Sequence, residues 1–144
     1  MTVKGKIRII GGRYRGRKIS VVHEEIRPTS DRVRETLFNW LSPILVNKCC
    51  LDLFAGTGIL GIEALSRGAR KVVFVDHQED IVSEIKNQTI KLQLKNASVI
   101  LSDSFSYLEN PKHLGPFDII FLDPPFGVYS LEKLLEYIDK TKLL

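Results

Sequence analysis

The sequence predicts a doubly wound α/β fold, which is a parallel sheet with helices on both faces, preceded by a basic N-terminal segment. From residue 49 onward, short apolar runs alternate with amphipathic stretches, as in parallel strands joined by helices. The 144 residues fit one domain, and 44% hydrophobic with 26% charged residues is ordinary for a globular protein. No apolar run approaches membrane-spanning length and no signal-peptide pattern occurs, so we expect a cytoplasmic protein.

Positive charge is concentrated in the first 40 residues. They carry ten Lys and Arg against four Asp and Glu, a net +6, whereas residues 41–144 carry eleven against thirteen, a net −2. Ile7, Ile9 and Ile19, with Gly-Gly and Arg-Gly between them, predict two short strands joined by a tight turn. We expect a basic hairpin extension over residues 1–26, whose charge suits either a polyanion or a solvated face.

The stretch RPTSDRVRETLFNWL, residues 27–41, changes to a helical period. Pro28 and a cap at Thr29 or Ser30 mark the start of the helix, and Pro43 predicts its end. Apolar residues recur at the spacing of one helical face, and we expect them to be buried: Val33, Leu37, Trp40 and Leu41.

The rest of the chain reads as alternating strands and helices. Strands are expected over residues 49–54, 71–76, 97–103 and 117–123, and helices over 58–68, 79–94, 104–110 and 130–140. Cys49 and Cys50 are adjacent, so in a strand their side chains point to opposite faces. Two such cysteines form neither a disulfide framework nor a metal site, and we interpret them as small buried hydrophobes in a reducing compartment.

Acidic residues mark the carboxyl ends of the expected strands. Ligands of doubly wound sheets bind beyond these ends. An aspartate lies at or near the end of all four strands: Asp52, Asp76, Asp103 and Asp123. Four carboxylates around one edge indicate a ligand site there.

The stretch LDLFAGTGILG, residues 51–61, contains G-x-G-x-x-G between a strand and a helix. Gly56 and Gly58 fit positions where the backbone approaches a ligand closely or takes a positive φ. Asp76 follows Gly56 by 20 residues, the distance at which dinucleotide folds place the carboxylate that accepts the ribose hydroxyls. The loop and Asp76 alone leave a dinucleotide and S-adenosylmethionine equally favoured, with a purely structural turn as the third reading.

The neighbouring charges favour the methyl donor. A pyrophosphate binds at a helix N-terminus through amides and basic side chains, and the Asp52 carboxylate would repel it. S-adenosylmethionine has an ammonium and a sulfonium but no phosphate, so a carboxylate there is useful. Asp103 and Ser104 could meet the adenine.

A second motif, FLDPPF, occupies residues 121–126 at the same edge. An ordinary Pro-Pro turn is the structural alternative, in which the prolines only stiffen the chain. The functional reading lets the Asp123 carboxylate and the Pro124 carbonyl accept the two N–H groups of an exocyclic base amine, with Phe126 stacked on the base. Positioning and electrostatics then supply catalysis without a metal, and the base must be unpaired or flipped to enter.

With these residues the chain resembles the bacterial 16S ribosomal RNA (guanine-N2)-methyltransferases that act on one small-subunit guanine. The resemblance rests on IRIIGGRYRGRKI (7–19), RPTSDRVRETLFNWL (27–41), LDLFAGTGILGIEALSRGA (51–69) and FLDPPF. The glycine loop and Asp-Pro-Pro-Phe occur in many methyltransferases, whereas the two N-terminal stretches are more specific. The resemblance implies a Rossmann-like class I methyltransferase domain over residues 27–144 behind the hairpin.

It also implies roles for particular residues. S-adenosylmethionine would contact Asp52, Phe54, Gly56, Gly58, Asp76, Asp103 and Ser104, and the target guanine Asp123, Pro124 and Phe126. Ribosomal RNA, free or within the 30S subunit, would meet Arg8, Arg13, Arg15, Arg17, Lys18 and Arg27. Arg32 and Arg34 could reach RNA or, equally, pair with Asp31 or Glu35.

Members of the resembled family usually continue for some tens of residues beyond this chain's last helix. We therefore expect the C-terminal strands of the fold to be missing and the strand FDIIFL to be an open edge, in a monomer that can associate through it. Three alternatives stay open: a DNA adenine-N6 methyltransferase, a catalytically impaired RNA- or donor-binding protein, and a nicotinamide oxidoreductase. The last lacks an evident acid, because His23, His77 and His113 show no suggestive spacing.

Overall fold

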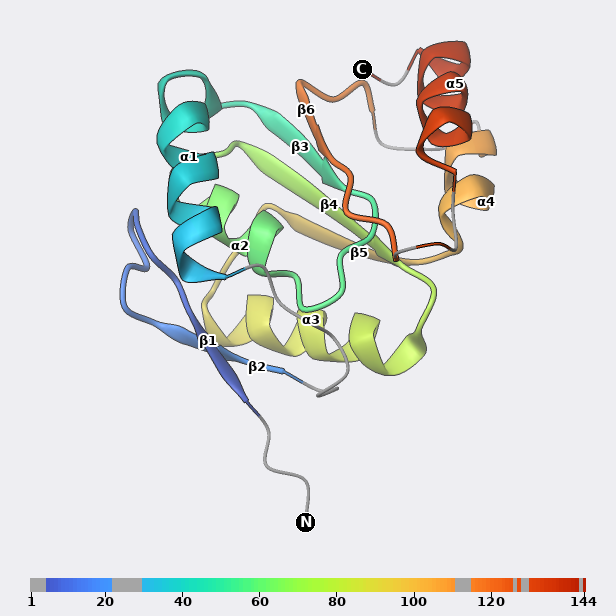
Figure 1. The fold of residues 1–144 in the computed structure, drawn as a ribbon. Helices are drawn as coiled ribbons and strands as arrows, with labels where there is room; N and C mark the ends of the chain where they lie inside the picture. The colour runs from blue at the N-terminus through green and yellow to red at the C-terminus, as the bar shows by residue number, and fades with distance from the viewer. Residues whose placement is uncertain (1–4, 22–29, 111–114, 126, 128–129, 143) are drawn as a thin grey trace.

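The computed structural model describes residues 5–21, 30–110, 115–125, 127, 130–142 and 144 (Figure 1). Two short strands, β1 (Lys6–Arg8) and β2 (Lys18–Ser20), pair antiparallel and precede helix α1 (Asp31–Leu45). Within the described part of the chain, the helices are too short or too polar to cross a membrane.

The main sheet has four parallel strands in the order β5-β4-β3-β6. These strands are β3 (Cys49–Asp52), β4 (Lys71–Asp76), β5 (Ala97–Leu101) and β6 (Ile119–Phe121). The helices that alternate with them are α2 (Ile59–Ser66), α3 (Glu79–Lys91), α4 (Ser104–Glu109) and α5 (Leu131–Thr141). The chain winds outward from β3 to β5 and then returns to the other side of β3. This topology confirms the predicted doubly wound fold.

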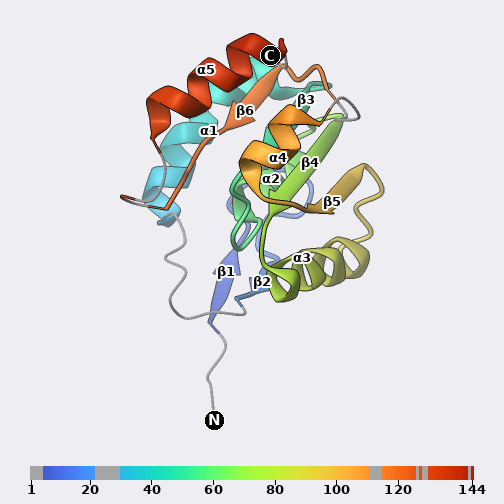
Figure 2. The same cartoon turned by 90° about the vertical axis from the view of Figure 1, so that its right-hand side faces the viewer.

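Helices cover both faces of this sheet, with α1, α2 and α3 on one side and α4 and α5 on the other (Figures 1 and 2). The buried strand side chains alternate between two cores. Val72 and Phe74 pack towards α1, α2 and α3, whereas Val73 and Val75 pack towards α4 and α5. Such two-sided burial explains the nearly continuous apolar runs of the strands.

The two cysteines are free thiols on opposite faces of the sheet, as predicted, but only Cys50 is buried, and Cys49 is partly buried. Burial raises the pKa of Cys50 to about 12, with smaller contributions from neighbouring acidic groups. A thiol with so high a pKa is not nucleophilic at neutral pH, so Cys50 acts as a core residue.

The hairpin belongs to the same core as α1, α2 and α3, because Ile7, Ile9, Ile19 and Val21 are buried in it. The predicted tight turn is wrong: residues 9–17 form a longer connection between β1 and β2. Its base is closed by the Ile9 N–H donating to the Arg17 carbonyl at 2.8 Å. The extra residues fold over the end of α2, and the contacts that hold them there are described below.

The predicted buried face of α1 is also wrong. Val33 is 54% exposed and Trp40 is 75% exposed, and Leu37 and Leu41 are only partly buried. The buried face consists of Arg34, Phe38 and Leu45 instead. A charged residue occupies a core position of this helix because acidic groups pair with it, which an apolar pattern does not reveal.

The ends of α1 agree with the sequence at the start and differ at the finish. The Ser30 hydroxyl accepts from the Val33 N–H at 3.3 Å, which confirms the cap, while Pro28 and Thr29 lie outside the described residues. Pro43 does not end the helix, which continues to Leu45. Near the end of a helix, a proline removes a single backbone hydrogen bond, and that loss is tolerated in this helix.

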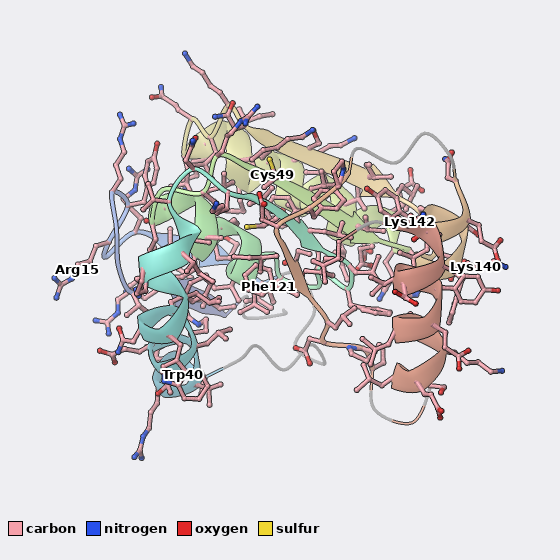
Figure 3. All side chains as sticks on the ribbon, turned by 90° about the horizontal axis from the view of Figure 1, so that it is seen from above. Arg15, Trp40, Cys49, Phe121, Lys140 and Lys142 are labelled. Atoms are coloured by element: carbon pink, nitrogen blue, oxygen red, sulfur yellow. The ribbon has the colours of Figure 1, made fainter. Side chains whose placement is uncertain are left out.

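Strand β6 pairs with β3 on one side, and no other described strand pairs with it. Exposed apolar side chains occur on the two helices that flank it, namely Val33, Trp40 and Ile44 on α1 and Leu131 and Leu135 on α5. Phe121 of β6, labelled in Figure 3, packs against Phe38 of α1, with ring centroids 5.9 Å apart. The association of the chain through this edge stays a prediction.

Candidate active site

The carboxyl ends of β3, β4 and β6 lie at one edge of the sheet, where the arrowheads in Figure 1 point. Asp52 ends β3 and lies in register between Phe74 of β4 and Phe121 of β6. Asp123 comes two residues after β6, so it leaves the sheet next to Asp52. The chain reverses its winding between β3 and β6, and such switch points form the ligand crevice of doubly wound sheets.

Asp52 is a buried carboxyl group, 1% exposed. Burial raises its pKa to about 8; the charges of Asp123 and Asp76 raise it further, and the Gly61 N–H, which donates to Oδ2 at 3.3 Å, lowers it only in part. Among the described residues no cationic side chain forms an ion pair with Asp52. A buried carboxylate with so little compensation favours a positively charged ligand.

The glycine loop lies over Asp52 and is held by Asp76. The Gly56 N–H donates to Asp76 Oδ2 and the Gln78 N–H to Asp76 Oδ1, each at 3.0 Å. Gly58 is the N-cap of α2 and has a φ of +80°, a backbone conformation that residues with side chains rarely adopt. Asp76 therefore shapes the loop in addition to any contact with a ligand.

The third glycine serves packing rather than the loop. A Cβ on Gly61 would lie 2.2 Å from Phe74 Cε1, so α2 can approach β4 this closely only with glycine there. The G-x-G-x-x-G spacing thus combines a loop that exposes backbone amides with a helix seated directly on the sheet.

Asp103 and Ser104 begin α4, and both side chains have partners in the protein. Asp103 Oδ2 accepts from the Ser106 N–H at 3.0 Å and hydroxyl at 2.9 Å, and these hydrogen bonds lower the pKa of Asp103. The buried Ser104 hydroxyl donates to the Leu53 carbonyl at 3.3 Å. Phe54 is partly buried against the core on this side of the sheet. Contacts of these three residues with adenine or donor stay predictions.

On the target side, Asp123 is exposed and Pro124 is partly buried just beyond β6. Phe126 lies outside the described residues. Asp52 and Asp123 thus present one buried and one accessible carboxyl group at the same edge. This difference allows two roles, one towards a bound cation and one towards an incoming substrate.

The residues at this edge fit S-adenosylmethionine. The four aspartates supply negative charge and hydrogen-bond acceptors, the loop supplies exposed backbone, and the buried Asp52 carboxyl group lacks a cationic partner in the described structure. Such a set suits an adenosine ligand that carries an ammonium and a sulfonium. Within the described ranges, no group of three or more His, Cys, Asp or Glu is arranged to hold a metal ion.

The basic residues of the hairpin are largely exposed. Arg15 points outward in Figure 3, and Arg13, Arg17 and Lys18 are exposed as well. Arg8 lies 3.7 Å from Asp31, with both side chains more than half exposed. Arg27 lies outside the described residues.

A buried carboxylate that the sequence analysis missed fixes this hairpin in place. Glu63 of α2 is fully buried and accepts from the Ile10 and Gly11 N–H groups, each at 2.9 Å. It also accepts from Arg67 Nε at 3.0 Å and Arg34 Nη1 at 3.2 Å. The available signal was a single acid within the apolar stretch GILGIEAL, because a charge on a buried helix needs partners.

Arg34 is the second buried member of this network. It donates to the Arg8 carbonyl at 2.8 Å and pairs with Asp31 and Glu63, and its side chain is fully buried. The hypothesis that Arg34 reaches RNA is therefore wrong. The alternative pairing with Asp31 is confirmed, although Arg34 makes it from the interior rather than the surface. Arg32 is exposed.

Helix α2 thus joins the glycine loop to the hairpin. Its first residues follow the loop, and near its other end the Ser66 hydroxyl accepts from the Tyr14 N–H at 2.9 Å and donates to the Gly11 carbonyl at 2.7 Å. The Ser66 carbonyl accepts from the Arg13 N–H at 2.7 Å. The hairpin is therefore held in a fixed position relative to the loop.

A polar cleft of about 360 Å³ lies between this hairpin and α1. Both charge signs line it, with basic side chains from Arg8, Arg15 and Arg67 and acidic ones from Asp31 and Glu35. Such a lining offers donors for phosphate and acceptors for base N–H groups.

Comparison with known proteins gives the family. A family model described as "Conserved hypothetical protein 95" matches residues 7–144. The Ribosomal RNA small subunit methyltransferase D of Haemophilus influenzae is 49% identical over 144 residues, covering 98% of this chain and 75% of that protein. The protein of the same name from Escherichia coli K12 is 43% identical over 136 residues, covering 94% and 68%.

Comparison with solved structures agrees with the family found from the sequence. The Escherichia coli protein yhhF superimposes with a TM-score of 0.86 at 42% identity, covering 95% of this chain and 74% of that one. A hypothetical protein of Thermus thermophilus superimposes with a TM-score of 0.81 at 28% identity, covering 95% and 79%. With its class I methyltransferase fold, the chain belongs to the family of the Ribosomal RNA small subunit methyltransferase D proteins.

Proposed function

We propose that this protein transfers a methyl group from S-adenosylmethionine to the exocyclic N2 amine of a guanine in 16S ribosomal RNA. The observation that carries the proposal is the juxtaposition of buried Asp52, under a glycine loop, with the exposed Asp123-Pro124 turn at one switch point. The names of the Haemophilus and Escherichia relatives support ribosomal RNA as the methyl acceptor. The Asp-Pro-Pro-Phe motif supports a base amine as the accepting atom.

At the donor side, we assign the positive groups of S-adenosylmethionine to the acidic edge. When bound, S-adenosylmethionine supplies an electrophilic methyl group on a sulfonium. Asp52 provides negative charge beneath the loop, and Asp76 holds the loop while offering acceptors to the ribose. Asp103 and Ser104 lie at the neighbouring strand end, where adenine would bind, and Phe54, Gly56 and Gly58 complete the site.

At the acceptor side, the lone pair of a guanine amine is delocalised into the ring, so the amine is a poor nucleophile. The Asp123 carboxylate and the Pro124 carbonyl accept its two N–H groups and turn the lone pair out of the ring plane. Asp123 also stabilises the positive charge that develops on the nitrogen. Phe126 holds the plane of the flipped base, so positioning supplies much of the rate.

The hairpin provides the contact with RNA phosphates through Arg8, Arg13, Arg15, Arg17, Lys18 and Arg27. Phosphate contacts position an RNA without reading its sequence. Because Glu63 and Ser66 hold the hairpin to α2, these cations keep a fixed distance from the glycine loop. We expect the substrate to be the 30S subunit or an assembly intermediate, modified in the cytoplasm by a monomer.

The direct test is methyl transfer to 30S particles isolated from cells that lack this modification. We expect tritium from labelled S-adenosylmethionine in N2-methylguanosine after digestion of the 16S RNA to nucleosides. Asp123→Asn should slow the transfer by about 10²–10³-fold while retaining donor binding, and Asp139→Asn, at an exposed position of α5, is the matched control.

Three outcomes would contradict the proposal. Label found in N6-methyladenosine of DNA and absent from RNA would identify a DNA methyltransferase. Binding of the donor without transfer to any 30S preparation would indicate a non-catalytic protein. Saturable binding of NADH would restore the oxidoreductase alternative.

A further inference from the structure

A second basic surface lies at the opposite edge of the sheet, where the strands begin. A cleft of about 320 Å³ opens between the segments that lead into β4 and β5. Five polar residues line it: Arg70, Lys71, Lys95, Asn96 and Ser98. The lining therefore contains three cations and two neutral hydrogen-bonding groups, with no carboxylate. This composition suits an anion.

The three cations of this cleft are not neutralised by the protein. Among the described residues, no carboxylate forms an ion pair with Arg70, Lys71 or Lys95. By contrast, Arg34 and Arg67 each pair with Glu63, and Arg8 pairs with Asp31. The fold thus supplies carboxylates to arginines elsewhere and leaves the charge of this cleft available.

The backbone around the cleft is fixed by hydrogen bonds between three segments. The Arg70 N–H donates to the Lys48 carbonyl at 2.8 Å, which ties the start of β4 to the segment before β3. The Val72 N–H donates to the Asn96 carbonyl at 3.0 Å, which ties it to the start of β5. The cations therefore project from a preorganised base, and binding an anion there orders only their side chains.

The cleft is close to the tip of the hairpin. The Ser66 carbonyl accepts from the Arg13 N–H, and Arg70 follows Ser66 by four residues, which limits the backbone separation to about 14 Å. Both surfaces lie away from the acidic edge. Lys71 begins β4 and Asp76 ends it, and five steps of about 3.3 Å separate the two by roughly 17 Å.

We propose that this cleft binds the phosphate backbone of the RNA substrate. It would extend the RNA-binding surface of the hairpin along the amino ends of the strands, away from the site of methyl transfer. The proposal rests on the proposed function, because it takes RNA as the substrate. An RNA that contacts both edges must bridge about 17 Å, which corresponds to about five stacked nucleotides at 3.4 Å per charge along one strand. An RNA shorter than about five nucleotides therefore cannot reach from a target base at the acidic edge to this cleft.

The test compares two variants of the full chain that each lose three positive charges. One is Arg70→Gln/Lys71→Gln/Lys95→Gln, and the control is Lys86→Gln/Lys133→Gln/Lys140→Gln, whose lysines are exposed on α3 and α5. The Kd for a 16S RNA fragment is measured at several KCl concentrations. We expect the cleft variant to bind about tenfold or more weakly and to lose about 2 from the slope of log K against log salt. The slope of the control variant should change by less than half as much as the slope of the cleft variant.

Folding and donor binding provide the remaining checks. The thermal midpoint and the Kd for S-adenosylmethionine should be the same in the cleft variant and the control, because none of these side chains is buried and the cleft lies away from the acidic edge. A cleft variant that keeps the parental salt slope, or that weakens only as much as the control, overturns the proposal. A parent protein that binds RNA but transfers no methyl group to it overturns the proposed function instead.

Discussion

The two ends of the sheet differ in charge, the carboxyl end being acidic and the amino end mainly basic, although Asp118 lies before β6 at the amino end and accepts from the Cys49 N–H. At the carboxyl ends of the strands lie Asp52, Asp76, Asp103 and Asp123, and at the amino ends lie Lys48, Arg70, Lys71 and Lys95. The hairpin tip adds Arg13 and Arg15 to the basic end through its contacts with the end of α2. In the proposed reaction, the acidic end takes a cationic donor and the basic end a polyanion. The separation keeps the carboxylates from repelling the phosphates.

The two ends also differ in burial. At the acidic end, ligand binding depends mainly on one buried carboxyl group, that of Asp52, whose pKa is raised by burial. The basic end spreads its charge over several side chains, of which Lys48, Arg70 and Lys95 are exposed and Lys71 is partly buried. A single substitution should therefore have a large effect at the acidic end and a small one at the basic end, unless it releases the hairpin itself.

Glu63→Ala releases the hairpin and should have the largest effect. It leaves Arg34 buried with only the half-exposed Asp31 as a carboxylate partner and the Ile10 and Gly11 N–H groups without their acceptor, so we expect a loss of about 3–5 kcal/mol in the free energy of unfolding. Urea denaturation followed by circular dichroism measures it. Glu132→Ala, on the exposed face of α5, is the control, and an equal loss in both variants would contradict the anchoring role.

Asp123→Asn tests the acidic end directly. The amide accepts less strongly from the target amine and carries no charge to stabilise the developing cation. We expect methyl transfer to 30S particles to slow by about 10²–10³-fold, with the donor Kd changed less than about threefold. Single-turnover kinetics with labelled donor separate the two quantities. A comparable loss of donor affinity would place Asp123 in the donor site.

Asp52 predicts a pH dependence of donor binding. Its pKa of about 8 means that the free protein carries the protonated acid at pH 6–7, whereas a cationic ligand favours the carboxylate. We expect the affinity for S-adenosylmethionine to rise by up to about tenfold per pH unit between pH 6 and 8 and then to level off. Calorimetry in buffers of different ionisation enthalpy should detect the released proton.

The same group should affect stability in the opposite direction. Burial raises the pKa of Asp52 from the ordinary aspartate value of 3.8, which holds in the unfolded chain, to about 8 in the folded protein. This shift contributes stability that is fully present below pH 3.8 and is lost as the pH rises through about 8. Asp52→Asn should remove both pH dependences. Donor binding that is independent of pH in the parent would show that Asp52 does not face the donor.

The smallest effect is expected at the basic end. Arg15→Gln removes one exposed charge of the hairpin and should raise the KM for 30S particles about threefold at low salt, with little change at about 0.5 M KCl. The stability should stay within about 0.5 kcal/mol of the parent. A KM effect that persists at high salt would mean that Arg15 makes a contact other than with phosphate.

The sequence predicts the sheet well because buried parallel strands read as apolar runs. KVVFVD is one such run, and the structure places β4 over the same residues, Lys71–Asp76. The aspartates at the strand ends were found by the same logic. The buried face of helix α1 could not be predicted in this way, because Val33 and Trp40 are apolar yet exposed while Arg34 is charged yet buried. A prediction based on hydrophobicity alone therefore assigns the wrong face of this helix to the core.

Long-range pairing was the other gap. Glu63 pairs with Arg67 and Arg34 with Asp31 at local helical spacings. The contacts that join the hairpin, α1 and α2 are between segments distant in sequence, so no local spacing predicts them. The cleft at Arg70, Lys71 and Lys95 was missed for a related reason. These residues lie in the part of the chain with a net negative charge, and only the fold separates them from the acids.

The contacts between the hairpin and α2 also determine when the hairpin can fold into its final position during synthesis. The hairpin is made first, but its hydrogen bonds reach residues 52 to 55 positions later in the chain. At a synthesis rate of about 5–20 residues per second, the partners emerge roughly 3–11 s afterwards. During that interval the basic N-terminus has no folded body to join. It must wait on the translating ribosome, itself an RNA particle, until the eighth residue of α2 has left the exit tunnel.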